Sequence, residues 1–340
     1  MSREIPAAGQ SIYIGIDIGN TKTGYITATG SGDVLTYFTG PGTNYHDVGT
    51  EETIKRVSAG YTRALVAGAG FELRGVFVGA AGADTITDYR VLETVFGSVF
   101  GAIPYHFDND GLVALKNGTE MLPGIVVTCG TGNTNYAVDD TGTVLRIGGL
   151  SEELGDRMGA SSIARATTSA AVRSLDGRDY PTIIPELLVS EFDIDSPQDL
   201  ITRFGDADVV PRVIKVLSEA ASRGDGRALS IFWDFTTEIL KIVDRFAVRL
   251  FPDRKPFRLV LDGPVYSAGY KTFLTMISLA VHARYSAEIV IPETPPVVGA
   301  LYLAYERDNL VLDETRIARV KETFRAQKSA RPRKSEEGLR

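Results

Sequence analysis

The sequence YIGIDIGNTKTG at residues 13–24 decides the fold class of this chain. Its first apolar residues predict a buried β-strand, and Asp17 falls where that strand ends. Gly19 and Asn20 suit a tight turn, because glycine has no side chain and asparagine tolerates positive φ. Such a turn can direct backbone N–H groups and nearby hydroxyls toward a phosphate, while Asp17 holds a hydrated Mg²⁺. An ordinary hairpin with a solvated aspartate explains the same residues, so both interpretations stay open here.

A similar pattern returns about a hundred residues later, in GIVVTCGTGNTNYAV at residues 124–138. A buried strand at 125–128 leads into a Gly/Thr turn at 130–133, and a second strand resumes at 136–138. Strand, turn and strand therefore occur twice, as a weak internal repeat. We expect two pseudo-equivalent lobes, each presenting a phosphate-holding hairpin to a shared cleft.

The composition limits the size, compartment and partners of the protein. Its 340 residues, 44% of them hydrophobic, are enough for two domains of roughly 150 residues each. A net charge of −7 gives no global attraction to nucleic acid or anionic lipid. Cys129 is the only cysteine, which excludes an internal disulfide framework and fits a reducing cytoplasm. The polar N-terminus and the lack of a run of ~20 apolar residues predict neither a signal peptide nor a membrane span.

Strands and helices are predicted to alternate along the remaining chain, which indicates an α/β fold. The helix at 228–251 has the clearest apolar face, and we expect Trp233 to pack within it. The other predicted helices cover 50–67, 89–96, about 157–173, 210–221, 277–281 and most of 295–306, with a last helical face at 317–324. The other predicted strands cover 25–28, 34–38, 103–107, 145–147 and 287–291, and strands running into turns cover 75–84 and 258–269.

Three polar residues, Asp108, Asn109 and Asp110, follow the strand predicted at 103–107. A carboxylate at the end of a strand is held firmly and faces a cleft in many α/β sites. Asp and Asn also cap helices frequently, and a helix is predicted to begin near Leu112. Without further context, capping explains these residues at least as well as catalysis does.

Eight motifs in order resemble the actin-like ATPase and sugar kinase superfamily. They are GIDIGNTKT, GPGTN, GAAGAD, NDGLVAL, CGTGN, GGLSEELGD, LVLDGPVY and PPVVGA, spanning about residues 13–306. Within the superfamily they look like the BadF/BadG/BcrA/BcrD-type ATPases, which join N-acetylglucosamine and glucosamine kinases with activators of CoA-ester dehydratases and reductases. The resemblance implies a two-lobed, ribonuclease H-like α/β fold with a mixed five-stranded sheet in each lobe. The lobes would cover 1–117, with a helix at about 297–326 packing back on it, and 118–296, followed by a disordered tail at 328–340.

The resemblance also implies a role for individual residues. Asp110 would be the catalytic base and would contact the substrate, and Asp17 would hold Mg²⁺. Asn44, Gly149 and Asp156 would bind the sugar, and Gly263 would lie beside adenosine. The first phosphate hairpin would comprise Gly19, Asn20, Thr21 and Lys22, and the second Gly130, Thr131, Gly132 and Asn133.

The function implied is an ATP- and Mg²⁺-dependent kinase that phosphorylates a hydroxyl of an amino sugar, with N-acetylglucosamine or glucosamine favoured. The alternatives are an ATPase activator, a non-catalytic sugar-sensing regulator and a pantothenate kinase of actin-like type. The lone Cys129 disfavours the activator, because one cysteine does not hold a cluster. We expect a small-molecule sugar as partner, no nucleic acid and no membrane, and homodimers only by resemblance.

Two segments depart from the sugar kinases of the family. The usual GGWG is Gly148–Ser151 here, without the tryptophan, and the usual GDEGS is GDRMG at 155–159. Arg157 therefore replaces an acid and reverses the local charge. It either recognises a carboxylate or phosphate on an unusual substrate, or points to solvent, or pairs with Glu152 or Glu153. Asp262 stands where a glycine is usual, and either binds a ribose hydroxyl or caps a turn.

Overall fold

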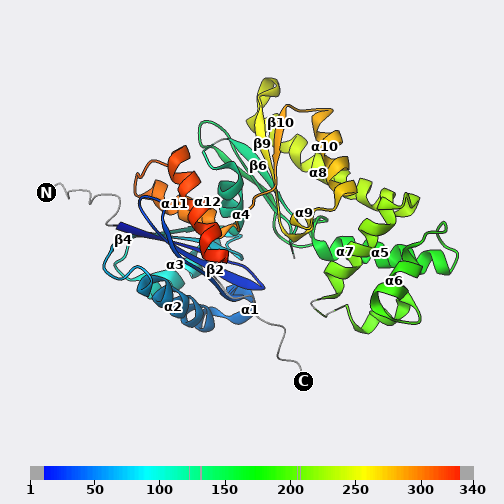
Figure 1. Cartoon of the computed structure of the whole chain (residues 1–340), viewed down its shortest axis with the longest axis horizontal. Helices are drawn as coiled ribbons and strands as arrows, with labels where there is room; N and C mark the ends of the chain where they lie inside the picture. The colour runs from blue at the N-terminus through cyan, green and yellow to red at the C-terminus, as the bar shows by residue number, and fades with distance from the viewer. Residues whose placement is uncertain (1–10, 122, 131, 205, 207, 330–340) are drawn as a thin grey trace. The chain divides into compact units, whose positions relative to one another are not determined.

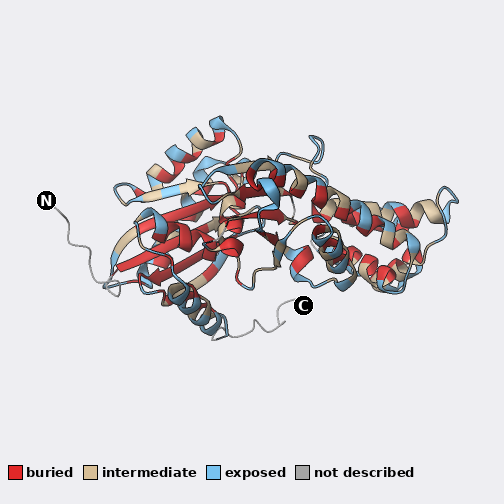
Figure 2. Ribbon diagram, turned by 90° about the horizontal axis from the view of Figure 1, so that it is seen from above, coloured by how far each residue is buried: buried red, intermediate tan, exposed pale blue. Residues whose placement is uncertain are grey.

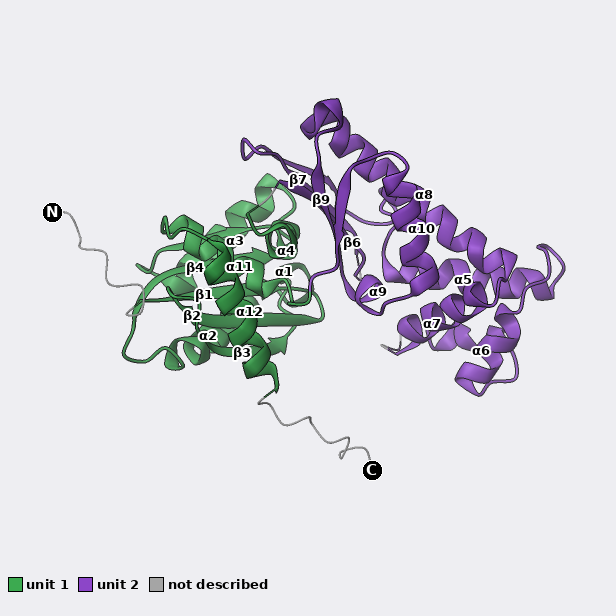
Figure 3. Cartoon of the chain, turned by 45° about the horizontal axis from the view of Figure 1, so that its top comes forward, with its two compact units in different colours: residues 1–121, 293–340 green, residues 122–292 purple. Residues whose placement is uncertain are grey.

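The computed structural model describes residues 11–121, 123–130, 132–204, 206 and 208–329. The chain forms two compact units, one made of residues 1–121 and 293–340 and the other of residues 122–292 (Figure 3). Residues 330–340, within the tail predicted to be disordered, lie outside the described residues, and Lys328 and Ser329 are the last residues of a helix.

The first unit is built on a five-stranded mixed sheet. Its strands are β1 (Ser11–Ile18), β2 (Lys22–Thr29), β3 (Val34–Pro41), β4 (Glu72–Ala80) and β5 (Tyr105–Asp108), in the spatial order β3-β2-β1-β4-β5. The first three strands form an antiparallel meander, and β4 and β5 run parallel to β1. The strand predicted from YIGIDIG is therefore the central strand of this sheet.

Helices cover both faces of the first sheet (Figure 1). On one face Ile14 and Ile16 of β1 pack with α2 (Thr50–Val66) and α3 (Ile86–Phe100). On the other, Tyr13 packs with α11 (Val297–Arg307) and α12 (Glu314–Ser329), and α4 (Asp110–Thr119) contacts α11. The alternation along β1 follows from the two-residue period of a strand. A short helix, α1 (Tyr45–Val48), precedes α2.

The second unit repeats the strand arrangement of the first. The strands β6 (Gly124–Thr128), β7 (Thr134–Val138), β8 (Val144–Gly148), β9 (Phe257–Asp262) and β10 (Ala287–Val290) lie in the order β10-β9-β6-β7-β8. Again the first three are an antiparallel meander, and the last two run parallel to the first. The internal repeat and the mixed five-stranded sheet predicted for each half are both confirmed.

The helices of the second unit lie between β8 and β10 in the sequence. They are α5 (Ala160–Leu175), α6 (Ile184–Phe192), α7 (Val209–Ser222), α8 (Gly226–Leu250), α9 (Pro264–Ser267) and α10 (Lys271–His282), with short 3₁₀ helices η1 (Pro197–Thr202) and η2 (Pro252–Arg254). One apolar core joins their inner faces to β6 and β9, and Figure 2 shows buried residues following the strands and these inner faces.

The expectation that Trp233 packs in the core is wrong. Its side chain is 52% exposed on α8. The buried stripe of α8 passes through Phe232, Phe235 and Ile239 at three- and four-residue spacing, and Trp233 lies about 100° around the helix from Phe232.

Within the described part of the chain, no helix is both long and apolar enough to cross a membrane.

Candidate active site

The register of the first sheet brings Asp17 into line with the end of β5. Asp17 on β1 pairs with Gly79 on β4, and Gly79 pairs with Asp108 on β5. All three strands are parallel, so their carboxyl ends lie at one edge of the sheet, where ligands commonly bind in α/β proteins. Asp110, the first residue of α4, follows two residues after Asp108. The metal residue and the base predicted from the sequence therefore flank one sheet edge.

The turn between β1 and β2 is held by the loop predicted to bind the sugar. Within the turn, the Gly19 amide donates to the Lys22 carbonyl (3.0 Å), while Asn20, Thr21 and Lys22 are exposed. The Thr43 amide donates to the Gly19 carbonyl (3.1 Å). The side-chain amide of Asn44 donates to Oδ1 of Asn20 (2.9 Å). Exposed residues on a braced turn match the phosphate-binding role expected of it.

Asn44 is itself buried, and its side chain serves this packing. Its Oδ1 accepts the His46 amide (3.0 Å) and caps α1. Gly82, with φ +87°, lies so close that a Cβ there would stand 2.5 Å from Oδ1 of Asn44. GPGTN and GAAGAD thus meet at Asn44, a contact between segments about 40 residues apart in sequence.

Asn109, next to the candidate base, is 1% exposed and fully engaged in hydrogen bonds. Its Oδ1 caps α4 by accepting the Gly111 amide (2.9 Å). Its Nδ2 donates to Oδ1 of Asp84 (3.0 Å) and to the carbonyl of Ala83 (3.3 Å). The capping interpretation is therefore confirmed for Asn109, and it leaves the adjacent, half-buried Asp110 in the first turn of the helix.

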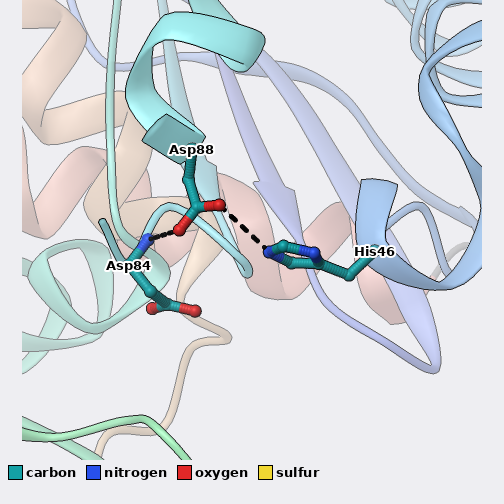
Figure 4. Close-up of side chains that lie close together, drawn as sticks. All are labelled: His46, Asp84 and Asp88. Carbon is teal, nitrogen blue, oxygen red and sulfur yellow. Dashed lines mark hydrogen bonds and ion pairs between the residues drawn. The ribbon is translucent and has the colours of Figure 1, made fainter. Parts of the chain in front are cut away.

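Among the described residues, His46, Asp84 and Asp88 form a cluster whose possible metal-ligand atoms lie within 4.8 Å of one another (Figure 4). The carboxylate of Asp88 already accepts the amides of Asp84 (3.2 Å) and Thr85 (2.7 Å), the Tyr45 hydroxyl, and His46 at 3.3 Å. Burial alone would raise the pKa of Asp88, but the hydrogen bonds from Tyr45 and Thr85 outweigh it and lower that pKa. We interpret the cluster as the cap of α3 in contact with the His46 ring.

The second turn, between β6 and β7, is braced from within its own unit. The Gly130 amide donates to the Gly132 carbonyl (3.1 Å), and the Ala160 amide of α5 donates to the Gly130 carbonyl (2.9 Å). Asn133 is 4% exposed, and its amide donates to the Thr128 carbonyl and to Asn135. Its side chain therefore shapes the turn. Thr131, predicted to bind phosphate, lies outside the described residues.

Gly148 and Gly149 bend the chain toward Asp156. Both have positive φ, and a Cβ on Gly148 would stand 2.5 Å from Oδ1 of Asp156. Oδ2 of Asp156 accepts the Leu150 amide (2.6 Å). The same Cβ on Gly148 would stand 3.2 Å from the Asn133 carbonyl, so this loop lies against the second turn. Gly149 and Asp156, both predicted to bind substrate, come together here.

Arg157 extends from this loop as an exposed cation. Glu152 pairs with Arg165. Among the residues that the structure describes, Arg157 has no hydrogen-bond or ion-pair partner. The alternative in which Arg157 pairs with Glu152 or Glu153 is therefore wrong.

Gly263 lies against the second turn from the end of β9. Its φ is +122°, and a Cβ there would stand 2.4 Å from the Cys129 carbonyl. The Cys129 amide donates to the Asp262 carbonyl (2.8 Å), which ties β9 to the strand before the turn. Complete burial raises the pKa of the Cys129 thiol, so this cysteine is a packing residue rather than a nucleophile.

The residues predicted from the sequence thus form two groups, one in each unit. Asp17, the first turn, Asn44 and Asp110 belong to the first unit. Gly130, Gly132, Asn133, Gly149, Asp156 and Gly263 belong to the second. Sequence reasoning missed the part played by Asp84, the last residue of the GAAGAD motif, which accepts a hydrogen bond from Asn109.

The Asp17 carboxylate and the turn at residues 19–22 in the first unit fit a hydrated Mg²⁺ and a polyphosphate. Asp17 offers a half-buried carboxylate at the sheet edge, and oxygen ligands with several waters are what Mg²⁺ prefers. The neighbouring turn offers backbone amides, two exposed side chains with hydrogen-bond donors, and the Lys22 ammonium.

The chain matches the sequence model of the BadF/BadG/BcrA/BcrD ATPase family over residues 14–304. It is 26% identical over 314 residues to an N-acetyl-D-glucosamine kinase of Dictyostelium discoideum, covering 87% of this chain and 98% of that protein. It is 30% identical over 223 residues to an N-acetylmuramic acid/N-acetylglucosamine kinase of Clostridium acetobutylicum, covering 62% of this chain and 71% of that protein.

Solved structures give the same fold. A Chromobacterium violaceum protein described as a candidate N-acetylglucosamine kinase superposes with a TM-score of 0.65 at 19% identity. The match covers 86% of this chain and 98% of that one. It confirms the predicted α/β fold, which has a five-stranded sheet in each unit.

Proposed function

Because the chain belongs to the BadF/BadG/BcrA/BcrD ATPase family, we propose that it is an ATP-dependent sugar kinase. Membership of an ATPase family implies that the chain uses ATP. The acceptor in this proposal is a hydroxyl of an amino sugar, and N-acetylglucosamine and glucosamine are the first candidates. Two relatives named as N-acetylglucosamine kinases support that choice, one of them matched over 98% of its length.

The observation that carries the proposal is the alignment of Asp17, Gly79 and Asp108 at one sheet edge, with Asp110 just beyond it. Phosphoryl transfer requires mainly positioning and stabilisation of charge. In the proposed site, bound ATP supplies the phosphoryl group. Asp17 would hold a Mg²⁺ ion through oxygen, which would shield the charge of the phosphates, and the amides and cation at residues 19–22 would bind them.

Asp110 is the proposed general base. A sugar hydroxyl is a weak nucleophile, and a carboxylate within hydrogen-bond reach orients it and accepts its proton. In the second unit, the turn at 130–133 and Gly263 are assigned to the nucleotide, and Gly149 and Asp156 to the sugar. Carboxylate and amide groups suit the paired donors and acceptors of sugar hydroxyls.

An acidic amino sugar is a second candidate substrate, and Arg157 is the observation that favours it. Its guanidinium is exposed and has no partner among the described residues, one position after the proposed sugar ligand Asp156. Arginine binds carboxylates through two parallel hydrogen bonds. The Clostridium relative is named for N-acetylmuramic acid, which is N-acetylglucosamine carrying a lactyl carboxylate.

The test is ADP release from ATP and Mg²⁺ against glucosamine, N-acetylglucosamine, N-acetylmuramic acid, N-acetylmannosamine and glucose, with a no-sugar control. We expect strong stimulation by one amino sugar. Hydrolysis that no sugar changes would refute the kinase assignment and favour an ATPase activator or a sugar-sensing regulator.

Arg157→Gln, assayed with the same sugars, separates the two substrate candidates. If the acidic sugar is the substrate, its kcat/KM falls by roughly 10-fold or more, as expected for losing a charge-assisted contact. The value for N-acetylglucosamine then stays within a factor of about 2. Equal changes for both sugars would rule out a role for Arg157 in reading a carboxylate.

A further inference from the structure

Asp84 is linked to the candidate base Asp110 through the buried side-chain amide of Asn109. Oδ1 of Asp84 accepts Nδ2 of Asn109 at 3.0 Å, and Asn109 is 1% exposed. Oδ1 of the same Asn109 side chain accepts the Gly111 backbone amide at 2.9 Å and so fixes the first turn of α4. Asp110 lies between Asn109 and Gly111 in the chain, so both of its neighbours are held by the same side chain.

The end of the strand before Asp110 is held by hydrogen bonds to Asp108. The Asn109 backbone amide donates to Oδ1 of Asp108 at 2.7 Å, and the Tyr89 hydroxyl donates to the same oxygen at 2.6 Å. The Gly79 backbone also packs closely against α4, since a Cβ there would stand 2.4 Å from Cγ2 of Val113. These contacts hold the end of β5, and the Asn109 side chain holds the first turn of α4.

Asp84 is itself fixed at the start of α3. Its backbone amide donates to Oδ2 of Asp88 at 3.2 Å, and Asp88 caps α3 together with Thr85. The position of Asp84 therefore depends on the Asp88 carboxylate, which lies outside α4, and not on the Thr85 side chain, which only accepts the Asp88 amide. A chain of hydrogen bonds runs from the N-terminus of α3 through Asp84 and Asn109 to the N-terminus of α4.

We propose that Asp84 is a positioning residue for phosphoryl transfer, which acts through Asn109 to hold Asp110 in the orientation that a general base needs. The proposal rests on the proposed function. Hydrogen bonds to an ionised acceptor are stronger than neutral ones, so a carboxylate suits the task of fixing a buried amide. Without it, the Ala83 carbonyl at 3.3 Å is the described acceptor left to Nδ2 of Asn109.

Loss of this contact has a specific kinetic consequence. The first turn is braced by Thr43 and Asn44 rather than by Asp84, so nucleotide binding has a separate support. A shift of about 1 Å at a reacting group lowers rates by as much as 10²-fold. We therefore expect Asp84→Ala to lower kcat by about 10²-fold, with the KM for ATP within a factor of about 2.

The experiment compares Asp84→Ala, Asp84→Asn and the control Thr85→Ala, with the sugar that wild type prefers. Asn at position 84 keeps an oxygen acceptor for Asn109, so Asp84→Asn should keep most of kcat. Thr85→Ala removes a helix cap one residue away and leaves the Asp84–Asn109 bond in place. It should lower the melting temperature while kcat stays within a factor of about 2 to 3.

A second comparison keeps the proposal testable if Asp84→Ala fails to fold. Asn109→Asp places a carboxylate against Asp84 and should lower kcat, and adding Asp84→Asn restores a donor–acceptor pair and should recover at least part of the loss. An Asp84→Ala enzyme with normal kcat, a Thr85→Ala enzyme that is equally slow, or a double variant no better than Asn109→Asp would each overturn the proposal. A wild type that phosphorylates no sugar in the panel would instead refute the proposed function, and the role of Asp84 with it.

Discussion

Gly42 offers a direct test of how the GPGTN loop supports the first phosphate turn. A Cβ at Gly42 would stand 1.8 Å from the backbone oxygen of Asn20, whereas ordinary contacts begin near 3.4 Å. In Gly42→Ala the turn therefore has to move by about 1.5 Å. Because the obstacle is backbone, it does not yield by a change of rotamer.

Two effects of Gly42→Ala follow. Forcing a methyl group into a packed contact costs about 1–3 kcal/mol of unfolding free energy, or about 2–4 °C in melting temperature for each kcal/mol in a domain of this size. Displacement of Asn20 should also lower kcat/KM for ATP by about 10²-fold, since the phosphates lose their aligned donors.

Gly40→Ala is the matched control, two residues away in the same GPGTN motif. A Cβ at Gly40 would meet a ring carbon of Tyr25 at 3.6 Å, an ordinary contact. Gly40 lies in β3, where alanine is favoured over glycine by about 0.5–1 kcal/mol, so this variant should match or exceed wild-type stability. Thermal melts and ATP saturation curves measure both variants. Equal behaviour of the two would refute the argument that the loop sets the turn by direct contact.

Three further predictions address the base, the second turn and acid stability. Asp110→Asn should lower turnover by roughly 10²–10⁴ while ATP affinity, measured by calorimetry, stays nearly unchanged; normal turnover would remove Asp110 as the base. Gly263→Ala should be less stable than Gly269→Ala in thermal melts. Both glycines have positive φ, but only a Cβ at Gly263 would collide, at 2.4 Å from the Cys129 carbonyl, so equal losses of stability would contradict this argument. Burial alone would raise the pKa of Asp225, but hydrogen bonds from Ala228, Ile183 and Thr182 outweigh it and lower that pKa. The stabilisation is therefore present above the unfolded-state pKa near 4 and is lost as pH falls through the folded-state value, so Asp225→Asn should flatten the acid limb of stability against pH.

The local elements of this fold follow from short-range chemistry. Alternating apolar residues predicted β1 and β6, and glycine with asparagine or threonine predicted the turns after them. The repeat of that pattern predicted two similar sheets, because the same local sequence builds the same hairpin. The family followed from eight motifs in order, and the match over residues 14–304 confirms it.

Side-chain environment was harder to predict where it depends on which face of a helix is covered. The expected packing of Trp233 failed because apolar character alone does not say that a residue lies within the buried stripe. For Asn133, the structure adds that the buried side-chain amide donates to Thr128 and Asn135 within the turn, and its role at a phosphate stays a prediction.

The sequence by itself determined the two strand–turn–strand units and the residue types at the ends of their strands, because turns and strand periodicity depend on neighbours in the chain. Only the tertiary structure decided that Asp17 is in line with Asp108, that Gly42 touches Asn20 and that Asp84 holds Asn109. These contacts join segments tens of residues apart, and they depend on strand register and helix placement, which are fixed by packing of the whole unit rather than by any local motif.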